Sequence, residues 1–463
     1  MRRLVVVSNR VADLTKSSQS GGLAVGLADS LRQRGGVWLG WDGKTADTSE
    51  NLEPVSKQIG DVTQIVLPLT RQDYEEYYLG FSNSVLWPLF HYRLDLVDYK
   101  TVYLDGYRRV NARFADALMS SLREDDLIWI HDYHLLPLAA ELRQRGCKQR
   151  IGFFLHIPLP PPEILSAVPR HRWLVESLLQ FDVIGLQSQT DLNNLQHYVE
   201  QHLSSTMTGD GRFQWGDREV IAGVFPIGID VDAFVEMAER PNDEVLIETR
   251  RREILGRRQV IGVDRLDYSK GLPDRLRAFA RLLELYPEMR KSVALMQIAT
   301  PTREEVEAYV EIRTELEALS GAINGRFADF NWTPVHYIHG TVPRDALAAL
   351  FRSSQVGFVT PLRDGMNLVA KEYIAAQSMD NPGVLVLSKF AGAAEDLREA
   401  LIVNPYDVDD MARNLCRALT MPLDERQDRQ RALMERIRKR DNASWLNNFL
   451  ATLEHSKSPP PLD

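Results

Sequence analysis

The stretch that decides the fold reads Val260-Ile261-Gly262-Val263-Asp264-Arg265-Leu266-Asp267-Tyr268-Ser269-Lys270-Gly271. A short apolar run is followed by a charged loop, and the residues after Gly271 have the spacing of an amphipathic helix. Such a unit builds parallel α/β sheets, whose ligands bind at the carboxyl ends of the strands. The two cations of the loop, Arg265 and Lys270, could therefore converge on one anion beside the helix N-terminus. The alternative is a solvated loop in which Asp264 and Asp267 neutralise both cations.

The same alternation of short apolar runs and longer helical segments extends in both directions. The predicted strands form two series, 4–7, 37–41, 127–130, 151–155 and 183–186, then 260–263, 293–298, 335–338, 356–359 and 384–387. The predicted helices include 135–144, 191–203, 272–285, 303–319, 368–377 and 445–455. Continuous apolar strands that alternate with helices predict an α/β fold with parallel, doubly wound sheets.

The two series of strands are separated by a break in the pattern. Residues 224–230 are typical of a strand and a turn, and the following residues to about 258 are highly charged and helical in character. We therefore place a boundary near residue 235, which gives a domain of residues 1–235 and a domain of residues 236–442. Ligands are expected in the cleft between the carboxyl ends of the two sets of strands.

Composition excludes several classes of protein. The chain has 463 residues, of which 44% are hydrophobic and 26% charged, with a formal net charge of -9. This acidic balance is not suited to coating nucleic acid or anionic lipid, and no apolar run approaches the ~20 residues of a membrane helix. The basic start is followed by only a short apolar run, which favours a buried strand over a signal peptide. We expect a cytoplasmic protein in which Cys147 and Cys416 are reduced thiols.

A second polar cluster, residues 360–372, follows the predicted strand 356–359 and opens a helix. Gly365 permits a tight turn, and the backbone N–H groups of Met366 to Leu368 would face the cleft. Glu372 lies about one turn into the helix, where its carboxylate could accept hydrogen bonds from two hydroxyl groups. The alternative is that an aspartate caps the helix and Glu372 lies on its surface.

Three further motifs lie near predicted strand ends. Paired glycines at Gly21 and Gly22 could admit a phosphate, although most such loops only turn the chain. Arg10 lies just beyond the first strand. Thr302 and Glu305 have the spacing of a capping box, which predicts Arg303 in the first turn of a helix. A cation there is unfavourable unless an anion lies nearby, and a neighbouring glutamate could instead neutralise it.

Aromatic and polar side chains gather near the strand ends of the first half. They are Trp41, Tyr78, Trp87, the run His131-Asp132-Tyr133-His134, and His156. Aromatic faces beside carboxylates and imidazoles suit sugars, whereas core packing is the usual role of such aromatic residues. A metal site at residues 131–134 would need a strand to continue through them, and we do not expect one. Asp230-Val231-Asp232 resembles a metal-binding DxD pattern but is interpreted as a turn.

Together these motifs resemble the trehalose-6-phosphate synthase family of retaining glycosyltransferases. The matching segments are 5–10, 21–26, 38–41, 77–93, 105–111, 129–137, 151–158, 264–271, 297–298, 361–372 and 404–406. They follow the family order and span nearly the whole chain. The resemblance implies a GT-B architecture of two Rossmann-like domains facing across a cleft, with a C-terminal helix, about 443–463, that crosses back to the first domain.

The resemblance also implies residue roles. The implied donor-binding residues are Gly22, Arg265, Lys270, Asp364, Gly365, Met366, Asn367, Leu368 and Glu372. The implied acceptor-binding residues are Arg10, Trp41, Tyr78, Trp87, Asp132 and Arg303, and the implied catalytic residues are Arg265, Lys270, Asp132 and His156. Within these sets, Arg265 and Lys270 hold the diphosphate, Glu372 the ribose and Asp364 the donor glucose. Arg10, Tyr78 and Arg303 hold the acceptor phosphate.

The implied reaction transfers glucose from UDP-glucose to glucose 6-phosphate with retention and needs neither cofactor nor metal. Alternatives are a related synthase with another acceptor, such as glycerol 3-phosphate, and a catalytically silent sugar-phosphate sensor. The presence of four of these donor-binding residues, Arg265, Lys270, Asp364 and Glu372, argues against the sensor. The chain has no room for the phosphatase domain that many relatives carry, so we expect a separate trehalose-6-phosphate phosphatase. We also expect a homo-oligomer, a dimer or a tetramer.

Overall fold

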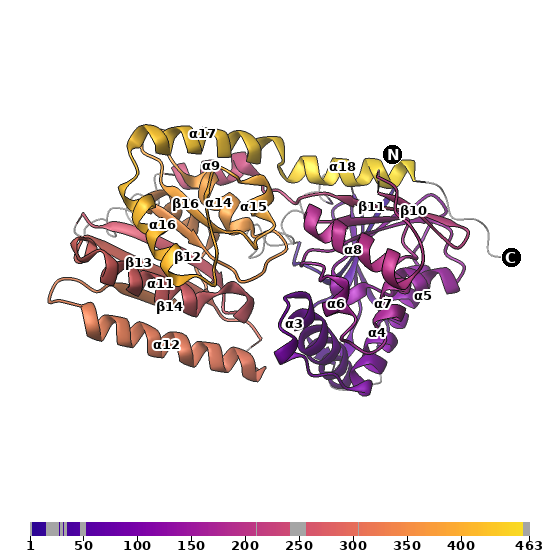
Figure 1. The fold of residues 1–463 in the computed structure, drawn as a ribbon. Helices are drawn as coiled ribbons and strands as arrows, with labels where there is room; N and C mark the ends of the chain where they lie inside the picture. The colour runs from indigo at the N-terminus through magenta and orange to yellow at the C-terminus, as the bar shows by residue number, and fades with distance from the viewer. Residues whose placement is uncertain are drawn as a thin grey trace. The chain divides into compact units, whose positions relative to one another are not determined.

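The computed structural model describes residues 2–14, 27, 31, 35–46, 52–209, 211–240, 256–303 and 305–456. The chain divides into two compact units, one formed by Met1–Pro226 with Trp445–Asp463 and the other by Ile227–Ser444. Each unit contains one large β-sheet flanked by helices (Figure 1). The α/β class that the sequence predicts is confirmed.

The first unit contains a nine-stranded sheet. Its strands are β1 (Leu4–Arg10), β2 (Gly36–Trp41), β4 (Val55–Ile59), β5 (Val62–Val66), β7 (Leu127–His131), β8 (Arg150–Phe154), β9 (Val183–Leu186), β10 (Arg212–Trp215) and β11 (Arg218–Val224), and a small second sheet pairs β3 (Thr45–Ala46) with β6 (Leu69–Thr70). Its helical segments are α2 (Arg71–Asp73), η1 (Tyr74–Leu86), α3 (Trp87–Phe90), η2 (Leu94–Leu96), α4 (Thr101–Met119), η3 (Tyr133–Leu135), α5 (Leu138–Gln144), α6 (Pro162–Leu165), α7 (His171–Leu178) and α8 (Gln189–His202).

The second unit contains a six-stranded sheet. Its strands are β12 (Arg258–Arg265), β13 (Val293–Thr300), β14 (Val335–His339), β15 (Val356–Val359), β16 (Val384–Ser388) and β17 (Leu401–Val403). Its helical segments are α9 (Val231–Glu239), η5 (Tyr268–Lys270), α11 (Leu272–Leu285), η6 (Pro287–Met289), α12 (Glu307–Phe327), α13 (Arg344–Ser353), α14 (Leu368–Ala376), α15 (Ala393–Asp396), α16 (Val408–Thr420) and α17 (Leu423–Lys439), while α18 (Asn442–His455) leads into the first unit.

Strand order shows where ligands should bind. The second sheet runs β14-β13-β12-β15-β16-β17 with every pairing parallel. This is the doubly wound order of nucleotide-binding folds, whose crevice opens where the order reverses, between β12 and β15. In the first sheet, the order β10-β11-β9-β8-β7-β1-β2-β5-β4 reverses between β1 and β7. The loops after these four strands are therefore the places to look for a site.

Helices cover both faces of the second sheet. Helix α11 packs against α12 and α16, whereas α14 packs against α9, α13 and α17. Figure 1 shows α12 on one side of this sheet and α9 with α17 on the other. Helical segments on both faces bury the strands, which explains why the strands read as continuous apolar runs.

The last helix, α18, packs on the strands of the first unit. Phe449 stacks on Trp129 of β7 with ring centroids 4.7 Å apart, and Trp445 meets Phe154 of β8 edge-on at 5.1 Å. A Cβ atom at Gly152 or Gly185 would lie within 3 Å of the Phe449 ring, at 2.7 and 2.8 Å. Glycine on β8 and β9 therefore allows the close approach of this helix.

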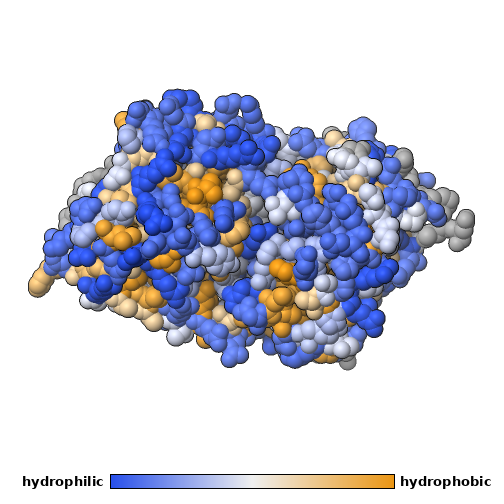
Figure 2. All heavy atoms as spheres, in the orientation of Figure 1, coloured by the Kyte–Doolittle hydropathy of each residue, from blue (hydrophilic) through white to orange (hydrophobic). Residues whose placement is uncertain are grey.

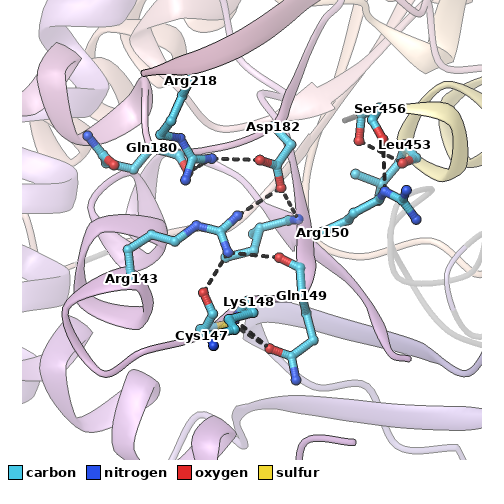
Figure 3. A network of polar contacts seen from close by, with 11 residues as sticks. Arg143, Cys147, Lys148, Gln149, Arg150, Gln180, Asp182, Arg218, Leu453 and Ser456 are labelled. Carbon is cyan, nitrogen blue, oxygen red and sulfur yellow. Dashed lines mark hydrogen bonds and ion pairs between the residues drawn. The ribbon is translucent and has the colours of Figure 1, made fainter. Parts of the chain in front are cut away.

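A buried ion-pair network ties together the amino ends of several strands in the first unit (Figure 3). The Asp182 carboxylate accepts hydrogen bonds from Arg143, Arg218 and the backbone N–H of Ile151 at 2.8, 2.6 and 2.7 Å. Close by, Arg150 Nε donates to the Ser456 carbonyl at the end of α18, at 2.9 Å. The network lies at the amino ends of these strands, opposite the carboxyl ends where ligands are expected, so we assign it to stability.

Several expectations need correction. The predicted boundary near residue 235 falls inside α9, and the structure divides the chain at Pro226 because α9 packs on α13 and α14. Arg303 does not lie in a helix: its φ is 48°, and α12 begins at Glu307. A left-handed backbone does not fit the first turn of an α-helix, where the capping-box interpretation placed Arg303. The paired glycines, including Gly22, and most of the charged segment 241–258 lie outside the described residues.

The face shown in Figure 2 is mainly hydrophilic, and its hydrophobic residues form separate patches. Throughout the described ranges, no helix is long and apolar enough to cross a membrane.

Candidate active site

An ion pair occupies the point in the second unit where the strand order reverses. Lys270 follows β12 and Asp364 follows β15, and the Lys270 Nζ donates to the Asp364 Oδ2 at 2.5 Å. Their side chains are 10% and 13% exposed, so both still reach the surface. Arg265, the last residue of β12, is exposed at the same edge. The two cations that the sequence singles out therefore lie where this fold binds ligands.

The two aspartates of the Arg265–Lys270 loop have buried partners of their own. Asp264 pairs with Arg275 of α11 at 2.7 Å, and Arg275 is fully buried. Asp267 accepts a hydrogen bond from the backbone N–H of Ser269 at 2.9 Å. Lys270 thus takes its ion-pair partner from another loop. Gly271 then turns the chain into α11 with φ 63°, where a Cβ would meet the Thr360 carbonyl at 2.5 Å.

Side-chain and backbone hydrogen bonds fix the conformation of the loop from Asp364 to Leu368. Asn367 has φ 74°, its side-chain oxygen caps α14 by accepting from the Ala370 N–H, and its amide donates to Asp364 at 3.0 Å. Met366 is buried, and its carbonyl accepts from the Ala393 N–H at 2.9 Å. Gly365 is buried beside Gly392. A Cβ atom at Gly392 would lie 1.9 Å from the Gly365 carbonyl oxygen. The N-terminus of α14 is therefore held next to Lys270.

Helix α14 carries two neighbouring titratable groups. Glu372 pairs with Arg344 at 3.5 Å, and burial raises the pKa of the Glu372 carboxyl although Arg344 opposes the shift. Lys371 is buried, and its Nζ donates to the Ile227 carbonyl at 2.7 Å. Burial lowers the pKa of Lys371 to about 8. Lys371 thus anchors α14 to the start of the second unit, whereas Glu372 is the residue that the family resemblance assigns to the ribose.

Arg303 lies beyond the end of β13, in the same unit as Lys270. Its Nη1 donates to the hydroxyl of Tyr309 at 2.6 Å, and that hydroxyl donates to the Asp267 carboxylate at 3.1 Å. The guanidinium side chain is 6% exposed. The structure therefore brings Arg303 next to the Arg265–Lys270 loop.

In the first unit, Arg10 lies at the end of β1 among aromatic rings. Its guanidinium carbon lies 4.8 Å from the ring centroid of Trp41 and 5.4 Å from that of Tyr78. Tyr78 also stacks on Tyr74 at 5.5 Å and on His134 at 5.9 Å. Arg10 itself is exposed, so these cation–π contacts hold an arginine in place at the surface.

Asp132 follows β7, across the reversal point from Arg10. Its φ of 76° and ψ of 165° lie in a region that is nearly exclusive to glycine, and such strain gathers at functional sites. Its carboxylate accepts from the backbone N–H of His156 at 3.3 Å. Together with Arg303 and Asn367, Asp132 is one of three predicted site residues among the non-glycine residues with positive φ.

His156 lies beside a second histidine that the sequence did not assign. His131 Nδ1 and His156 Nε2 lie 3.1 Å apart, and His131 is fully buried. Burial lowers the pKa of His156 to about 3 and, together with the charge of His156, lowers that of His131 well below 6.5. Both rings are therefore neutral near pH 7, so His156 can hydrogen bond to a sugar hydroxyl but is not a cation.

The remaining predicted residues lie deeper in the structure. Trp41 and Trp87 are 0% and 3% exposed, and Trp87 packs against His91 with centroids 4.1 Å apart. Their contact with a ligand stays a prediction. Asp230 caps α9 through the Ala233 N–H, and its neighbour Asp232 pairs with Arg438. Within the part of the chain that the structure describes, no three His, Cys, Asp or Glu side chains are grouped to hold a metal ion.

Comparison with known proteins shows the family of this chain. Glycosyltransferase family 20 matches residues 3–455. The trehalose-6-phosphate synthase of Salmonella arizonae is 49% identical over 455 residues, which cover 98% of this chain and 95% of that protein. The enzyme of Klebsiella pneumoniae is 48% identical over 456 residues, covering 98% and 96%.

Two solved structures are similar over nearly their whole length. One is the Burkholderia xenovorans UDP-forming α,α-trehalose-phosphate synthase in complex with glucose 6-phosphate, with TM-score 0.93 and 49% identity over 98% of this chain and 100% of that one. The other is the E. coli trehalose-6-phosphate enzyme bound with UDP-2-fluoro glucose, with TM-score 0.94 and 46% identity over 99% and 100%. The GT-B fold is thereby confirmed, and the chain belongs to glycosyltransferase family 20.

Proposed function

We infer that this chain transfers glucose from UDP-glucose to glucose 6-phosphate, and so forms α,α-trehalose 6-phosphate and UDP. The observation that carries the inference is the cluster of Arg265, Lys270 and Asp364 at the reversal point of the second sheet. Near-full-length relatives with this activity, and solved structures of such relatives with a donor analogue or the acceptor, support it.

The donor is assigned to the second unit. Arg265 and Lys270 neutralise the diphosphate, and the backbone N–H groups after Asp364 add donors at the N-terminus of α14. Glu372 accepts hydrogen bonds from the ribose hydroxyls, and Asp364 from those of the glucose. The Lys270 Nζ and the Asp364 Oδ2 lie 2.5 Å apart. Lys270 can therefore contact the diphosphate while Asp364 contacts the glucose that is attached to it.

The acceptor is assigned to a second set of residues. Arg10, Tyr78 and Arg303 bind the phosphate of glucose 6-phosphate, while Asp132 orients the sugar and His156 contacts the donor glucose. The exposed guanidinium of Arg10 lies 5.4 Å from the Tyr78 ring centroid, which supports a shared phosphate site. Trp41 and Trp87 shape the acceptor pocket from buried positions.

The reaction retains the configuration of the donor carbon, as a relative studied with bisubstrate mimics does. A retaining hydrolase usually places a carboxylate nucleophile beneath that carbon, and we assign none here. Instead, the bond from glucose C1 to the diphosphate breaks while the acceptor hydroxyl attacks from the same face, and its proton passes to the leaving diphosphate. Arg265 and Lys270 stabilise the charge that develops on the diphosphate, which is the main source of rate enhancement. No metal or cofactor is required.

A nucleotide-release assay tests this function. UDP-glucose, ADP-glucose and GDP-glucose are each combined with glucose 6-phosphate, glucose and glycerol 3-phosphate, and both the released nucleotide and the sugar product are measured. We expect the highest rate with UDP-glucose and glucose 6-phosphate. Faster turnover with glycerol 3-phosphate would identify a related synthase with that acceptor. Calorimetric binding of both substrates without nucleotide release would instead indicate a silent sensor.

The biological setting is part of the same proposal. The product carries a phosphate, so release of free trehalose requires a separate trehalose-6-phosphate phosphatase. We place the reaction in the cytoplasm and expect a homo-oligomer, a dimer or a tetramer. Sedimentation analysis of the purified chain measures the oligomeric state directly.

A further inference from the structure

A buried carboxylate connects two loops that the proposed function assigns to different substrates. Asp267 is 0% exposed and belongs to the loop that carries Arg265 and Lys270. One of its oxygens accepts from the Ser269 N–H at 2.9 Å, directly before Lys270. The Asp267 carbonyl also accepts from the Lys270 N–H at 3.0 Å. Asp267 thereby sets the backbone from which the diphosphate-binding lysine projects.

The second carboxylate oxygen of Asp267 faces the arginine assigned to the acceptor phosphate. The Tyr309 hydroxyl donates to this oxygen at 3.1 Å and accepts from Arg303 Nη1 at 2.6 Å. Arg303 Nη1 itself lies 3.6 Å from the same oxygen. The guanidinium, the hydroxyl and the carboxylate thus form a hydrogen-bonded chain, through which the carboxylate helps to hold the arginine.

Burial fixes the direction of the hydrogen bonds that connect Arg303, Tyr309 and Asp267. Tyr309 is 1% exposed, and burial together with the charge of Asp267 raises the pKa of its hydroxyl. The hydroxyl therefore keeps its proton and can donate to Asp267 while it accepts from Arg303. The left-handed backbone of Arg303, with φ 48°, is consistent with a side chain held by such contacts.

We propose that Asp267 is a positioning residue that couples the donor-binding loop to the acceptor-binding Arg303 through the Tyr309 hydroxyl. The proposal rests on the proposed function, because it takes Lys270 and Arg303 as binding groups for the two substrates. A loop that shifts when the diphosphate binds moves Asp267 and, through Tyr309, the guanidinium. Binding of the donor consequently changes the affinity for the phosphorylated acceptor, and linkage requires the converse.

A double-mutant cycle on Asp267 and Arg303 tests the coupling. The KM values for glucose 6-phosphate and UDP-glucose are measured for the wild type, Asp267→Asn, Arg303→Ala and the double variant. We expect Asp267→Asn to change the KM for glucose 6-phosphate by about fivefold or more in the wild type and by less than about twofold in the Arg303→Ala background. Its effect on the KM for UDP-glucose should persist in both. Additive effects on the acceptor KM would overturn the proposal.

Tyr309→Phe gives a second test that preserves the shape of the side chain. It should raise the KM for glucose 6-phosphate about tenfold, as expected for loss of a hydrogen bond to a charged group, and leave turnover of unphosphorylated glucose unchanged. Tyr337→Phe is the matched control, because the buried Tyr337 hydroxyl on β14 has no hydrogen-bond partner among the described residues. An unchanged acceptor KM in Tyr309→Phe would refute the coupling, even if Asp267→Asn failed to fold.

The wild type separates this proposal from the proposed function. If the wild type releases no UDP with UDP-glucose and glucose 6-phosphate, the function itself is wrong. If the wild type is active but both sets of variants behave as independent changes, only the coupling is wrong.

Discussion

Lys270 and Asp364 form an ion pair across the reversal point of the second sheet, with Nζ and Oδ2 2.5 Å apart. They lie 94 positions apart in the chain, yet the fold makes them neighbours. The family resemblance assigns the lysine to the diphosphate and the aspartate to the glucose. Their contact means that the lysine is held in place before the donor arrives, as preorganised electrostatic stabilisation requires.

Replacement of Lys270 by alanine should therefore reduce turnover strongly. Loss of one cation at a developing oxyanion costs about 2–4 kcal/mol of transition-state stabilisation, or roughly 30- to 10³-fold in kcat/KM. Initial rates of UDP release measure the loss. Lys439→Ala, which removes a 72% exposed lysine of α17, is the control and should leave kcat/KM unchanged. A decrease of less than about tenfold in Lys270→Ala would contradict the assignment.

Replacement of Arg303 by alanine should affect the acceptor selectively. We expect the KM for glucose 6-phosphate to rise by about tenfold or more, because a hydrogen-bonded charge pair is lost, while the KM for UDP-glucose changes much less. Two-substrate kinetics measure both values. Glucose without a phosphate should be used equally well by both proteins. Equal increases in the two KM values would show that Arg303 does not bind the acceptor phosphate.

Features that depend on local pattern could be predicted from the sequence. The strands β9 and β15 have the predicted bounds, and α11 spans Leu272–Leu285 as expected, because buried parallel strands and amphipathic helices leave a periodic signal. The hairpin of β4 and β5 was not predicted. β4 is mostly exposed at the edge of its sheet and contains no apolar run.

The candidate site likewise has residues that the sequence predicts and residues that it does not. Arg265 and Lys270 could be singled out because charged residues follow an apolar strand. The partners that hold the site in place could not, because they come from remote parts of the chain: Tyr309 lies 42 positions from Asp267, and His156 lies 25 positions from His131. The sequence also misplaced Arg303 in a helix, because tertiary contacts override the local preference of a capping box.

Stability should depend on pH through the His131–His156 pair. The pKa of buried His131 lies well below 6.5 in the folded state, so the unfolded chain binds a proton that the folded chain does not. His131 therefore does not reduce the free energy of unfolding well above pH 6.5, and reduces it increasingly as the pH falls through and below 6.5. The loss between pH 7.5 and pH 5 is at most about 2 kcal/mol, which is the limit for a histidine that stays neutral throughout this range.

Denaturant unfolding at these two pH values measures this contribution. His131→Gln should show a smaller decrease in the free energy of unfolding between pH 7.5 and pH 5 than the wild type does. His197→Gln is the matched control, since His197 is exposed, and should show the wild-type decrease. Identical pH dependence in all three proteins would mean that His131 titrates normally.

Turnover should not depend on divalent metal ions. The charge of the leaving diphosphate is assigned to Arg265, Lys270 and backbone N–H groups, which do the work of a metal ion. We expect the full rate of UDP release after dialysis against excess EDTA and in its continued presence. Added Mg²⁺ should have no effect. A rate that EDTA abolishes and Mg²⁺ restores would contradict the assignment.

The strained backbone of Asp132 predicts that two variants that both lose activity differ in stability. With φ 76° and ψ 165°, the residue occupies a region that glycine adopts without strain, at a cost of about 1–3 kcal/mol for other residues. Asp132→Gly and Asp132→Ala both remove the carboxylate and should both lose activity toward glucose 6-phosphate. The glycine variant should nevertheless be more stable than the alanine variant, by about 1 kcal/mol or more, because only the alanine variant keeps the strain.

Denaturant unfolding of the two variants measures this difference, and Asp116 provides the control. Asp116 lies in α4, is 67% exposed and pairs with Arg145. There the order should reverse, with alanine more stable than glycine by about 1 kcal/mol, because glycine weakens a helix. If alanine were also the more stable residue at position 132, the backbone there would not be strained. The conformation of Asp132 would then have to be explained by its side-chain contacts alone.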